Sequence, residues 1–399
     1  MRADTPVVCL ASVDWAFNWQ IPQEVATGLA AAGHRVLYVE NTGVRSLAWG
    51  DVTRLTERAG NWWHARGRPR ATAPGVDVLA PIMLPWPYTA PAWRLNAAWL
   101  TARIQRWLAP GAAAPILITF LPTPVVAAVR AALRPALAVY YCTDRLAESS
   151  PSARRIAPHE QALMAQADVV LTTGIGLQRY AEAHASRAVL LPAGVRAAQF
   201  EAAAQAARSD PGRHRLLRGR PGPVVGFVGS LRPATDLALL TAAARLAPDL
   251  TFVAAGPVMA DVRPLEACPN VVLTGPLSHA DVVRWIAGFD VGVLPYLRTP
   301  FTHDLMPMKL KEYLAAGLPI VSTPLHEVHA FDAIHPGLIT FADTAPAFVA
   351  ALRAAIAVRQ PDSVAYRQSV ARQYDWTVQI ATLRAVLDEA GAARSGGGR

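Results

Sequence analysis

The chain has 399 residues, of which 52% are hydrophobic and 17% are charged. This composition excludes an intrinsically disordered protein, because it supplies enough apolar side chains to offset the entropy of an ordered chain. The length is typical of two domains. The net charge of +9 is concentrated in the first half, since residues 1–200 contain 19 Arg and 12 acidic residues. A basic surface attracts several kinds of anion, so charge alone selects no function.

The sequence favours a cytoplasmic protein. It contains no run of about 20 uninterrupted apolar residues, and its first residues lack the pattern of a secretory signal. Cys9, Cys142 and Cys268 lie far apart, in or beside apolar runs, and show no metal-ligand spacing. We therefore expect them to be buried thiols that pack as small hydrophobic residues.

One stretch of the first half mixes cations with aromatic residues. Residues 54–70 contain Trp62, Trp63, Arg66 and Arg68, and the apolar segment Ile82–Tyr88 follows. This mixture suits peripheral contact with the inner face of a membrane. A solvated arginine surface beside a buried hydrophobic loop explains the same residues, and the sequence leaves both interpretations open.

Short β-branched runs alternate with longer helical patterns along the whole chain. We predict strands at residues 6–11, 34–40, 115–120, 136–142 and 168–173, and then at 223–229, 250–255, 270–274, 290–295 and 319–323. A strand, a helix and another strand form a crossover unit, and continuously apolar strands indicate sheets covered on both faces. The expected fold class is therefore α/β, with two doubly wound, Rossmann-like parallel sheets.

A polar segment separates the two series of strands. Phe200–Pro223 contains an alanine-rich stretch, Ser209–Gly212 and the basic run Arg213–Arg220. Such segments leave a core without loss of buried area, so we place the domain boundary here, with domains at about 1–205 and 215–370. Ligands of open α/β sheets bind beyond the carboxyl ends of the strands, so the expected site lies in a cleft between the two domains.

The segment from His303 to Pro319 carries the strongest functional signal. Pro307 suits the first position of a helix that Gly317 then ends. The N-terminus of such a helix offers free N–H groups and partial positive charge to a phosphate. Lys309 and Glu312, three residues apart, share one face near that end.

Lysine occurs only in this segment. The other 36 of the 38 basic residues are arginine, whereas Lys309 and Lys311 stand two positions apart. The pairing suggests that a compact ammonium group is required here, although chance is an alternative.

These residues resemble the donor site of the GT-B retaining glycosyltransferases of family four, in which two acidic residues are separated by seven others. Asp304 and Glu312 have this spacing, with Asp in place of the usual first Glu. The resemblance implies that Glu312 holds the ribose, Lys309 the diphosphate and Asp304 the sugar hydroxyls. Pro307 and Met308, at the helix start, would also contact the donor.

Weaker matches surround this segment in the order that the family has them. Gly229 and Ser230 end the first strand of the second domain, and Arg232 then takes the place of a diphosphate-binding cation. The Gly256 turn and the backbone at Leu277 would line the nucleotide. The resemblance also implies that a C-terminal helix, residues 374–392, returns to the first domain.

The acceptor side is less clear. Asp14 and Trp15 follow the first strand, and Asp144 follows another strand at the same edge. The acids would meet acceptor hydroxyls, or would cap the next helices. Thr119-Phe120 stands where relatives often have a cleft histidine, so we name no catalytic histidine.

The expected site contains no metal. The sequence has neither His-Glu-x-x-His nor two aspartates separated by one residue. Lys309, Arg232 and the helix N-terminus would then neutralise the departing diphosphate. We expect no cofactor beyond a nucleotide-diphosphate sugar as co-substrate, and no nucleic-acid partner.

The predicted function is transfer of a sugar to a glycan, lipid-linked or small-molecule acceptor, in the biosynthesis of a surface polysaccharide. A nicotinamide-dependent dehydrogenase is disfavoured, because the run Gly174–Arg179 ends in arginine where a third glycine is needed. Two alternatives stay open: a nucleotide-sugar epimerase of the same fold, and a non-catalytic subunit that binds a nucleotide sugar.

Overall fold

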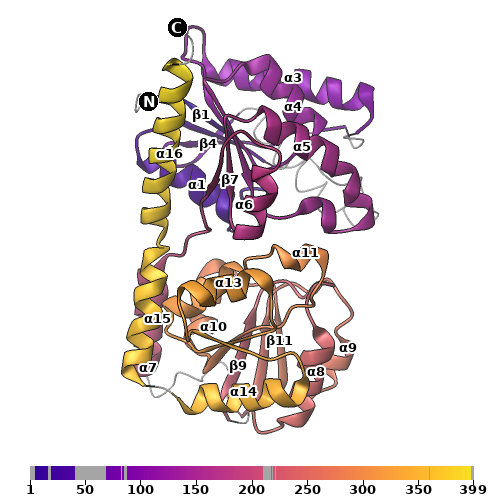
Figure 1. Cartoon of the computed structure of the whole chain (residues 1–399), viewed down its shortest axis with the longest axis vertical. Coiled ribbons are helices and arrows are strands. Elements are labelled where there is room, and N and C mark those ends of the chain that lie inside the picture. The colour runs from indigo at the N-terminus through magenta and orange to yellow at the C-terminus, as the bar shows by residue number, and fades with distance from the viewer. Residues whose placement is uncertain are drawn as a thin grey trace. The chain divides into compact units, whose positions relative to one another are not determined.

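The computed structural model describes residues 5–16, 19–40, 69–81, 83–84, 88–209, 217, 219–220, 222–358 and 360–396. The chain divides into two compact units, coloured from indigo to yellow along the chain in Figure 1. One unit comprises Met1–Pro192 together with Gln379–Arg399, and the other comprises Ala193–Val378.

The first unit contains an eight-stranded sheet with the order β3-β4-β2-β1-β5-β6-β7-β8. The strands are β1 (Val7–Leu10), β2 (Val36–Val39), β3 (Arg70–Ala73), β4 (Val76–Leu79), β5 (Ile116–Thr119), β6 (Leu137–Cys142), β7 (Val169–Thr172) and β8 (Ala188–Leu190). Only the β3–β4 pair among them is antiparallel. The helices are α1 (Ile21–Ala31), α3 (Ala90–Leu108), α4 (Pro124–Leu133), α5 (Ala157–Gln166), α6 (Ile175–Glu182) and the later part of α16 (Trp376–Gly396), with short 3₁₀ helices η2 (Leu146–Glu148) and η3 (Pro151–Ile156).

The second unit contains a six-stranded parallel sheet with the order β11-β10-β9-β12-β13-β14. The strands are β9 (Val224–Val228), β10 (Thr251–Ala255), β11 (Val271–Gly275), β12 (Val291–Leu294), β13 (Ile320–Ser322) and β14 (Ile339–Phe341). The helices are α7 (Ala197–Ser209), α8 (Leu237–Leu246), α9 (Arg263–Glu266), α10 (His279–Ala287), α11 (Pro300–His303), α12 (Met308–Ala315), α13 (His326–Ile334), α14 (Ala345–Ala357) and α15 (Pro361–Gln373).

The predicted fold class is confirmed, and each of the ten predicted strands overlaps one strand of the structure. Four strands were missed, and three of them lie at sheet edges. β3 is exposed, β8 is half-buried throughout, and the middle residue of β14 is exposed, so none shows a continuous apolar run. The cysteines are free and buried, as predicted.

The segment read as a domain boundary begins inside a helix. α7 buries Phe200 and Ala204 and packs with α10, α12 and α15 in the second unit. The chain therefore enters the second unit at Ala193, before the predicted boundary at about residue 205.

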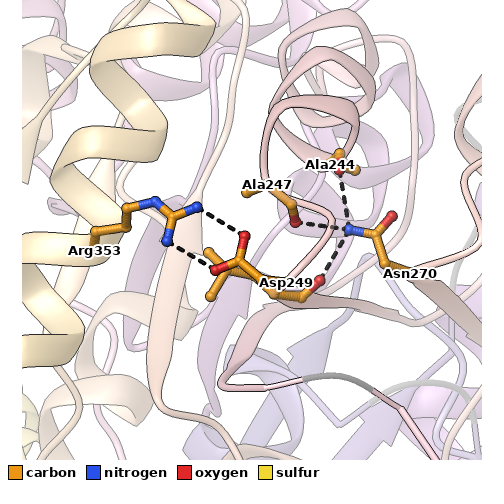
Figure 2. A network of polar contacts seen from close by, with 6 residues as sticks. Ala244, Ala247, Asp249, Asn270 and Arg353 are labelled. Atoms are coloured by element: carbon orange, nitrogen blue, oxygen red, sulfur yellow. Dashed lines mark hydrogen bonds and ion pairs between the residues drawn. The ribbon is translucent and has the colours of Figure 1, made fainter.

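Polar contacts hold the segment that connects α8 to β10 in place (Figure 2). The side-chain amide of Asn270 donates to the backbone oxygens of Ala244, Ala247 and Leu250, at distances of 2.9–3.0 Å. These carbonyls lie at or just beyond the helix C-terminus and need donors from outside it. Arg353 on α14 forms a two-pronged ion pair with Asp249 in the same connection. Because both ionic side chains are exposed, their ion pair contributes little stability, and we attribute the fixed conformation of this segment mainly to Asn270.

Candidate active site

Helix α12 is fixed against the centre of the second sheet. The ring of Tyr313 lies where a β-carbon on Gly292 would approach it to 2.4 Å, so only glycine in β12 permits this contact. The N–H of Val228, at the end of β9, donates to the Tyr313 hydroxyl at 2.9 Å. The helix begins at Met308 rather than at the predicted Pro307, which is extended with a ψ of 122°. Gly317 follows the helix with a φ of +73°, as its predicted terminating role requires.

The Lys309 ammonium reaches the carboxyl ends of β9 and β12. Its Nζ donates to the hydroxyl of Tyr296 at 2.7 Å and lies 5.2 Å from the ring centroid of Phe227. A β-carbon on Gly229 would stand 2.5 Å from Nζ, and Gly229 has a φ of +137°. The backbone conformation therefore favours glycine at this position, and the absence of a β-carbon leaves room for the end of the Lys309 side chain.

A second glycine brings the ends of β9 and β10 together. Gly229 donates its N–H to the oxygen of Ala255 at 2.9 Å. A β-carbon on Gly256, whose φ is +151°, would stand 2.3 Å from the Gly229 oxygen. Gly256 in turn pairs with Gly275 at the end of β11. The partly exposed Ser230 continues this rim of backbone groups, which a ligand can approach closely.

The loops that carry Arg232 and Leu277 adjoin this rim. The Arg232 side chain is exposed, and its turn is held because Thr235 pairs with Tyr296. Leu277 packs partly against the core just before α10. Both positions are therefore available at the rim, Arg232 by its side chain and Leu277 by its backbone.

Glu312 lies one turn beyond the start of α12, on the face that carries Lys309. Although some of its surface stays accessible to solvent, the loss of hydration raises its pKa to about 7, against the lowering effect of the Lys309 charge. A carboxyl group with this pKa changes its charge near neutral pH. Its ability to accept two hydroxyl hydrogen bonds changes with it.

Asp304 is the C-cap residue of α11 and is mostly buried, with its side chain 8% exposed. Its Oδ1 lies 4.0 Å from Nε2 of His303. The four residues from Asp304 to Pro307 connect α11 to α12, so the chain places Asp304 just before the Lys309 end of that helix.

The two lysines have different environments. Lys311 is 1% exposed; its Nζ donates to the oxygen of Ala193 at 2.6 Å and lies 4.7 Å from the ring of Tyr374. Burial lowers its pKa to about 7. Of the two lysines, only Lys309 is therefore placed to supply the ligand-binding ammonium group that the sequence suggested. Lys311 donates to a backbone oxygen inside the unit.

The predicted acceptor residues lie in the first unit. The backbone N–H of Trp15 donates to the Glu40 carboxylate at 3.0 Å, and the Trp15 ring packs edge-on against Tyr38. Asp14 and Asp144 follow β1 and β6 but are not at the N-cap positions of the next helices, which Gln20 occupies in α1 and Arg145 in η2. The capping alternative for these two acids is therefore wrong, and their acceptor role stays a prediction.

Within the described residues no group of three or more His, Cys, Asp or Glu side chains is arranged to hold a metal ion. No helix in the described part of the chain is both long and apolar enough to cross a membrane. The basic stretch 54–68 of the predicted membrane contact lies outside the described residues.

Sequence reasoning missed Tyr296. It supports the Lys309 ammonium and lies two residues beyond β12. Its position after a predicted strand was the only signal, and such a position alone does not distinguish a site residue from a loop residue.

Part of the second unit matches a known family of proteins. Residues 222–357 match the model of the family described as glycosyl transferases group 1. Over 166 residues the chain is 33% identical to the putative teichuronic acid biosynthesis glycosyltransferase TuaH of Bacillus subtilis. The match covers 40% of this chain and 42% of that protein, so the chain matches less than half of its relative.

Two solved structures share the fold over nearly the whole chain. Sucrose-phosphate synthase of Thermosynechococcus elongatus has a TM-score of 0.71 at 16% identity, with 98% of this chain and 100% of that chain covered. HepE of Anabaena in complex with UDP has a TM-score of 0.64 at 14% identity, with 97% and 100% covered. At such identities the likeness concerns the fold, which is that of GT-B glycosyltransferases. Residues 222–357 of this chain, which contain Lys309, Glu312 and the glycine rim, are therefore a domain of the glycosyl transferases group 1 family.

Proposed function

We propose that the protein is a glycosyltransferase that moves a sugar from a nucleotide-diphosphate donor to a glycan, lipid-linked or small-molecule acceptor. The observation that carries this proposal is the position of the Lys309 ammonium, next to Gly229 at the carboxyl end of β9. A positive charge beside open backbone suits a diphosphate, and the carboxyl edge of a parallel sheet is where such ligands bind. The family match of residues 222–357 supports it independently.

Each site residue has a role in the proposal. Lys309 and Arg232 neutralise the diphosphate as it leaves, with the start of α12 at Pro307 and Met308 adding partial positive charge. Glu312 accepts the ribose hydroxyls, and Asp304 holds the sugar. The rim at Gly229, Ser230, Gly256 and Leu277 lines the nucleotide, while Asp14, Trp15 and Asp144 contact the acceptor.

The proposal extends to a metal-independent, retaining reaction of family four. The cationic and backbone groups around Lys309 supply charge stabilisation that other transferases obtain from a metal. A solved relative in fold, HepE, is bound to UDP, which supports a nucleotide-sugar donor. The name of TuaH supports a role in polysaccharide biosynthesis. We place this step in the cytoplasm, peripherally at the inner face of the membrane, where the basic first half suits anionic lipid.

Product analysis tests the proposal. Purified protein is first screened by thermal shift against nucleoside diphosphates, since a ligand that binds the native state raises its apparent stability. The matching radiolabelled nucleotide sugars are then incubated with and without a cell extract as acceptor source. We expect nucleoside diphosphate release that depends on the acceptor, with label in an acceptor product.

The same assay separates the two alternatives. An epimerase converts one nucleotide sugar into another without acceptor, and a non-catalytic subunit binds nucleotide sugar without turnover. Either result, obtained with every extract fraction, contradicts sugar transfer by this protein.

The raised pKa of Glu312 predicts a pH dependence of donor binding. Because its pKa lies near 7, the carboxylate that accepts the ribose hydroxyls is a minor form at pH 6 and the major form at pH 8. We expect the nucleoside diphosphate to bind about tenfold more tightly at pH 8 than at pH 6, measured by calorimetry. The diphosphate itself titrates in this range, so Glu312→Gln is the control. This variant should bind the nucleoside diphosphate more weakly than wild type at pH 8, and its affinity should depend less on pH because only the titration of the diphosphate remains. Equal pH dependence in both proteins contradicts the assigned role.

A further inference from the structure

Two histidines that the proposed function does not use stack at the carboxyl edge of the second sheet. His303 is the last residue of α11, and His326 is the first residue of α13. Their ring centroids lie 4.4 Å apart with an interplanar angle of 24°. α11 follows β12 and α13 follows β13, which are neighbouring parallel strands. Both rings therefore stand at the edge at which α12 begins.

Each ring of this His303–His326 pair has a mostly buried carboxylate beside one nitrogen. Nε2 of His303 lies 4.0 Å from Asp304, and Nδ1 of His326 lies 3.5 Å from Glu327. The carboxylate side chains are 8% and 1% exposed, whereas the imidazoles are 58% and 36% exposed. Nδ1 of His326 is buried and has no hydrogen-bond partner among the described residues. Nδ1 of His303 and Nε2 of His326, the ring nitrogens turned away from these carboxylates, have no hydrogen-bond partner among the described residues, so the partly exposed rings can offer them to a ligand.

The start of α13 adds further donors to this place. Its N-cap residue is Leu325, whose side chain cannot accept a hydrogen bond from the first turn. The Glu327 carboxylate lies in the same first turn and offsets part of the partial positive charge of the first N–H groups, beside the ring of His326. Two imidazoles and an uncapped helix start form a set of donors that suits an oxyanion, and imidazole is the side chain that gains positive charge near neutral pH.

We propose that the His303–His326 pair binds a carboxylate on the transferred sugar, so that the protein selects a nucleotide-linked uronic acid over the neutral sugar. The proposal rests on the proposed function and extends it to the donor sugar. Along the chain, Lys309 is assigned to the diphosphate, Asp304 to the sugar hydroxyls, and His303 is the next residue outward. The order of these groups matches the order of diphosphate, sugar ring and acidic substituent in such a donor.

Matched donors test the proposal. Calorimetric titrations compare UDP-glucose with UDP-glucuronate and GDP-mannose with GDP-mannuronate, with UDP and GDP alone as references. For the base that binds, we expect the uronic acid to bind about tenfold or more tightly than its neutral partner, because hydrogen bonds to a charged group are strong. The double variant His303→Gln, His326→Gln should lose this preference and keep the affinity for the nucleoside diphosphate.

His329→Gln is the matched control, because His329 lies on α13 and stacks on Phe341 instead. It should keep the full preference. If the double variant loses nucleoside diphosphate binding, the single variant His303→Gln, which changes only the more exposed ring, is tested in its place. It should reduce the preference for the uronic acid donor several-fold. A wild-type protein that binds the nucleoside diphosphate but takes both sugars equally overturns the carboxylate proposal while the transferase proposal stands. If neither UDP nor GDP binds, the pair of donors is chosen for the nucleoside diphosphate that the thermal-shift screen identifies; a screen in which none binds overturns the donor site, and the carboxylate site with it.

Discussion

Replacing Lys309 with methionine is expected to abolish the thermal shift caused by the nucleoside diphosphate and to lower transfer about 100- to 1,000-fold. The ammonium group donates a hydrogen bond to the hydroxyl of Tyr296 and lies beside the backbone of Gly229. Lys311 cannot replace it, because its ammonium group is bonded to the oxygen of Ala193. Methionine keeps the length and apolar body of the side chain, so the change removes charge while the packing against Phe227 is retained. Differential scanning fluorimetry and the radiolabel assay measure both effects.

Tyr296→Phe is the control for Lys309→Met. It removes the hydroxyl that positions the ammonium but keeps the ring and the charge. We expect a smaller loss, about tenfold, because one hydrogen bond is removed. The diphosphate role of Lys309 is wrong if Lys309→Met folds normally and shows the same thermal shift as the wild type.

Replacing Lys311 with methionine is expected to remove a pH-dependent gain in stability. Burial lowers the pKa of this ammonium from 10.5 to about 7, so between these values the unfolded chain binds more protons than the folded one. Stability therefore rises with pH from about 7 upward, whereas below pH 7 both states are charged and this contribution is constant. The complete rise is up to about 5 kcal/mol, and urea unfolding at pH 6.5, 8 and 9.5 samples most of it.

Lys311→Arg separates charge from burial. Arginine keeps its proton throughout this range, so this variant should lack the gain and be less stable than wild type at every pH. Lys311→Met should also lack the gain. Its stability at pH 6.5 is set by two opposing effects: the variant no longer buries a charge, but it loses the hydrogen bond to Ala193. The same slope in all three proteins would show that Lys311 does not titrate in the folded state.

The central strands and helix α12 were predictable because their signals are local. β9 and β12 are continuous apolar runs, and the helix around Lys309 lies between a proline and a glycine. The spacing of Lys309 and Glu312 was sufficient to place them on one helical face. Edge strands such as β3 gave no signal, because an exposed strand that pairs on one side needs no apolar residues.

Contacts between distant segments could not be predicted. The different environments of Lys309 and Lys311 depend on Ala193, more than a hundred residues earlier in the chain. The stacking of His303 on His326 depends on two loops that follow neighbouring strands. In one sequence, each of these residues is an isolated polar side chain whose partner cannot be identified from spacing.

Helix α16 has a consequence for the order in which the protein folds during translation. Its residues from Gln379 onward belong to the first unit, where Leu383 and Leu387 are buried and Ile380 lies against Gly28. The ribosome therefore makes the whole of the second unit before the first has received its last helix. We expect the second unit of the nascent chain to fold first, which reverses the usual order, while the first unit stays incomplete and depends on chaperones until α16 has been made.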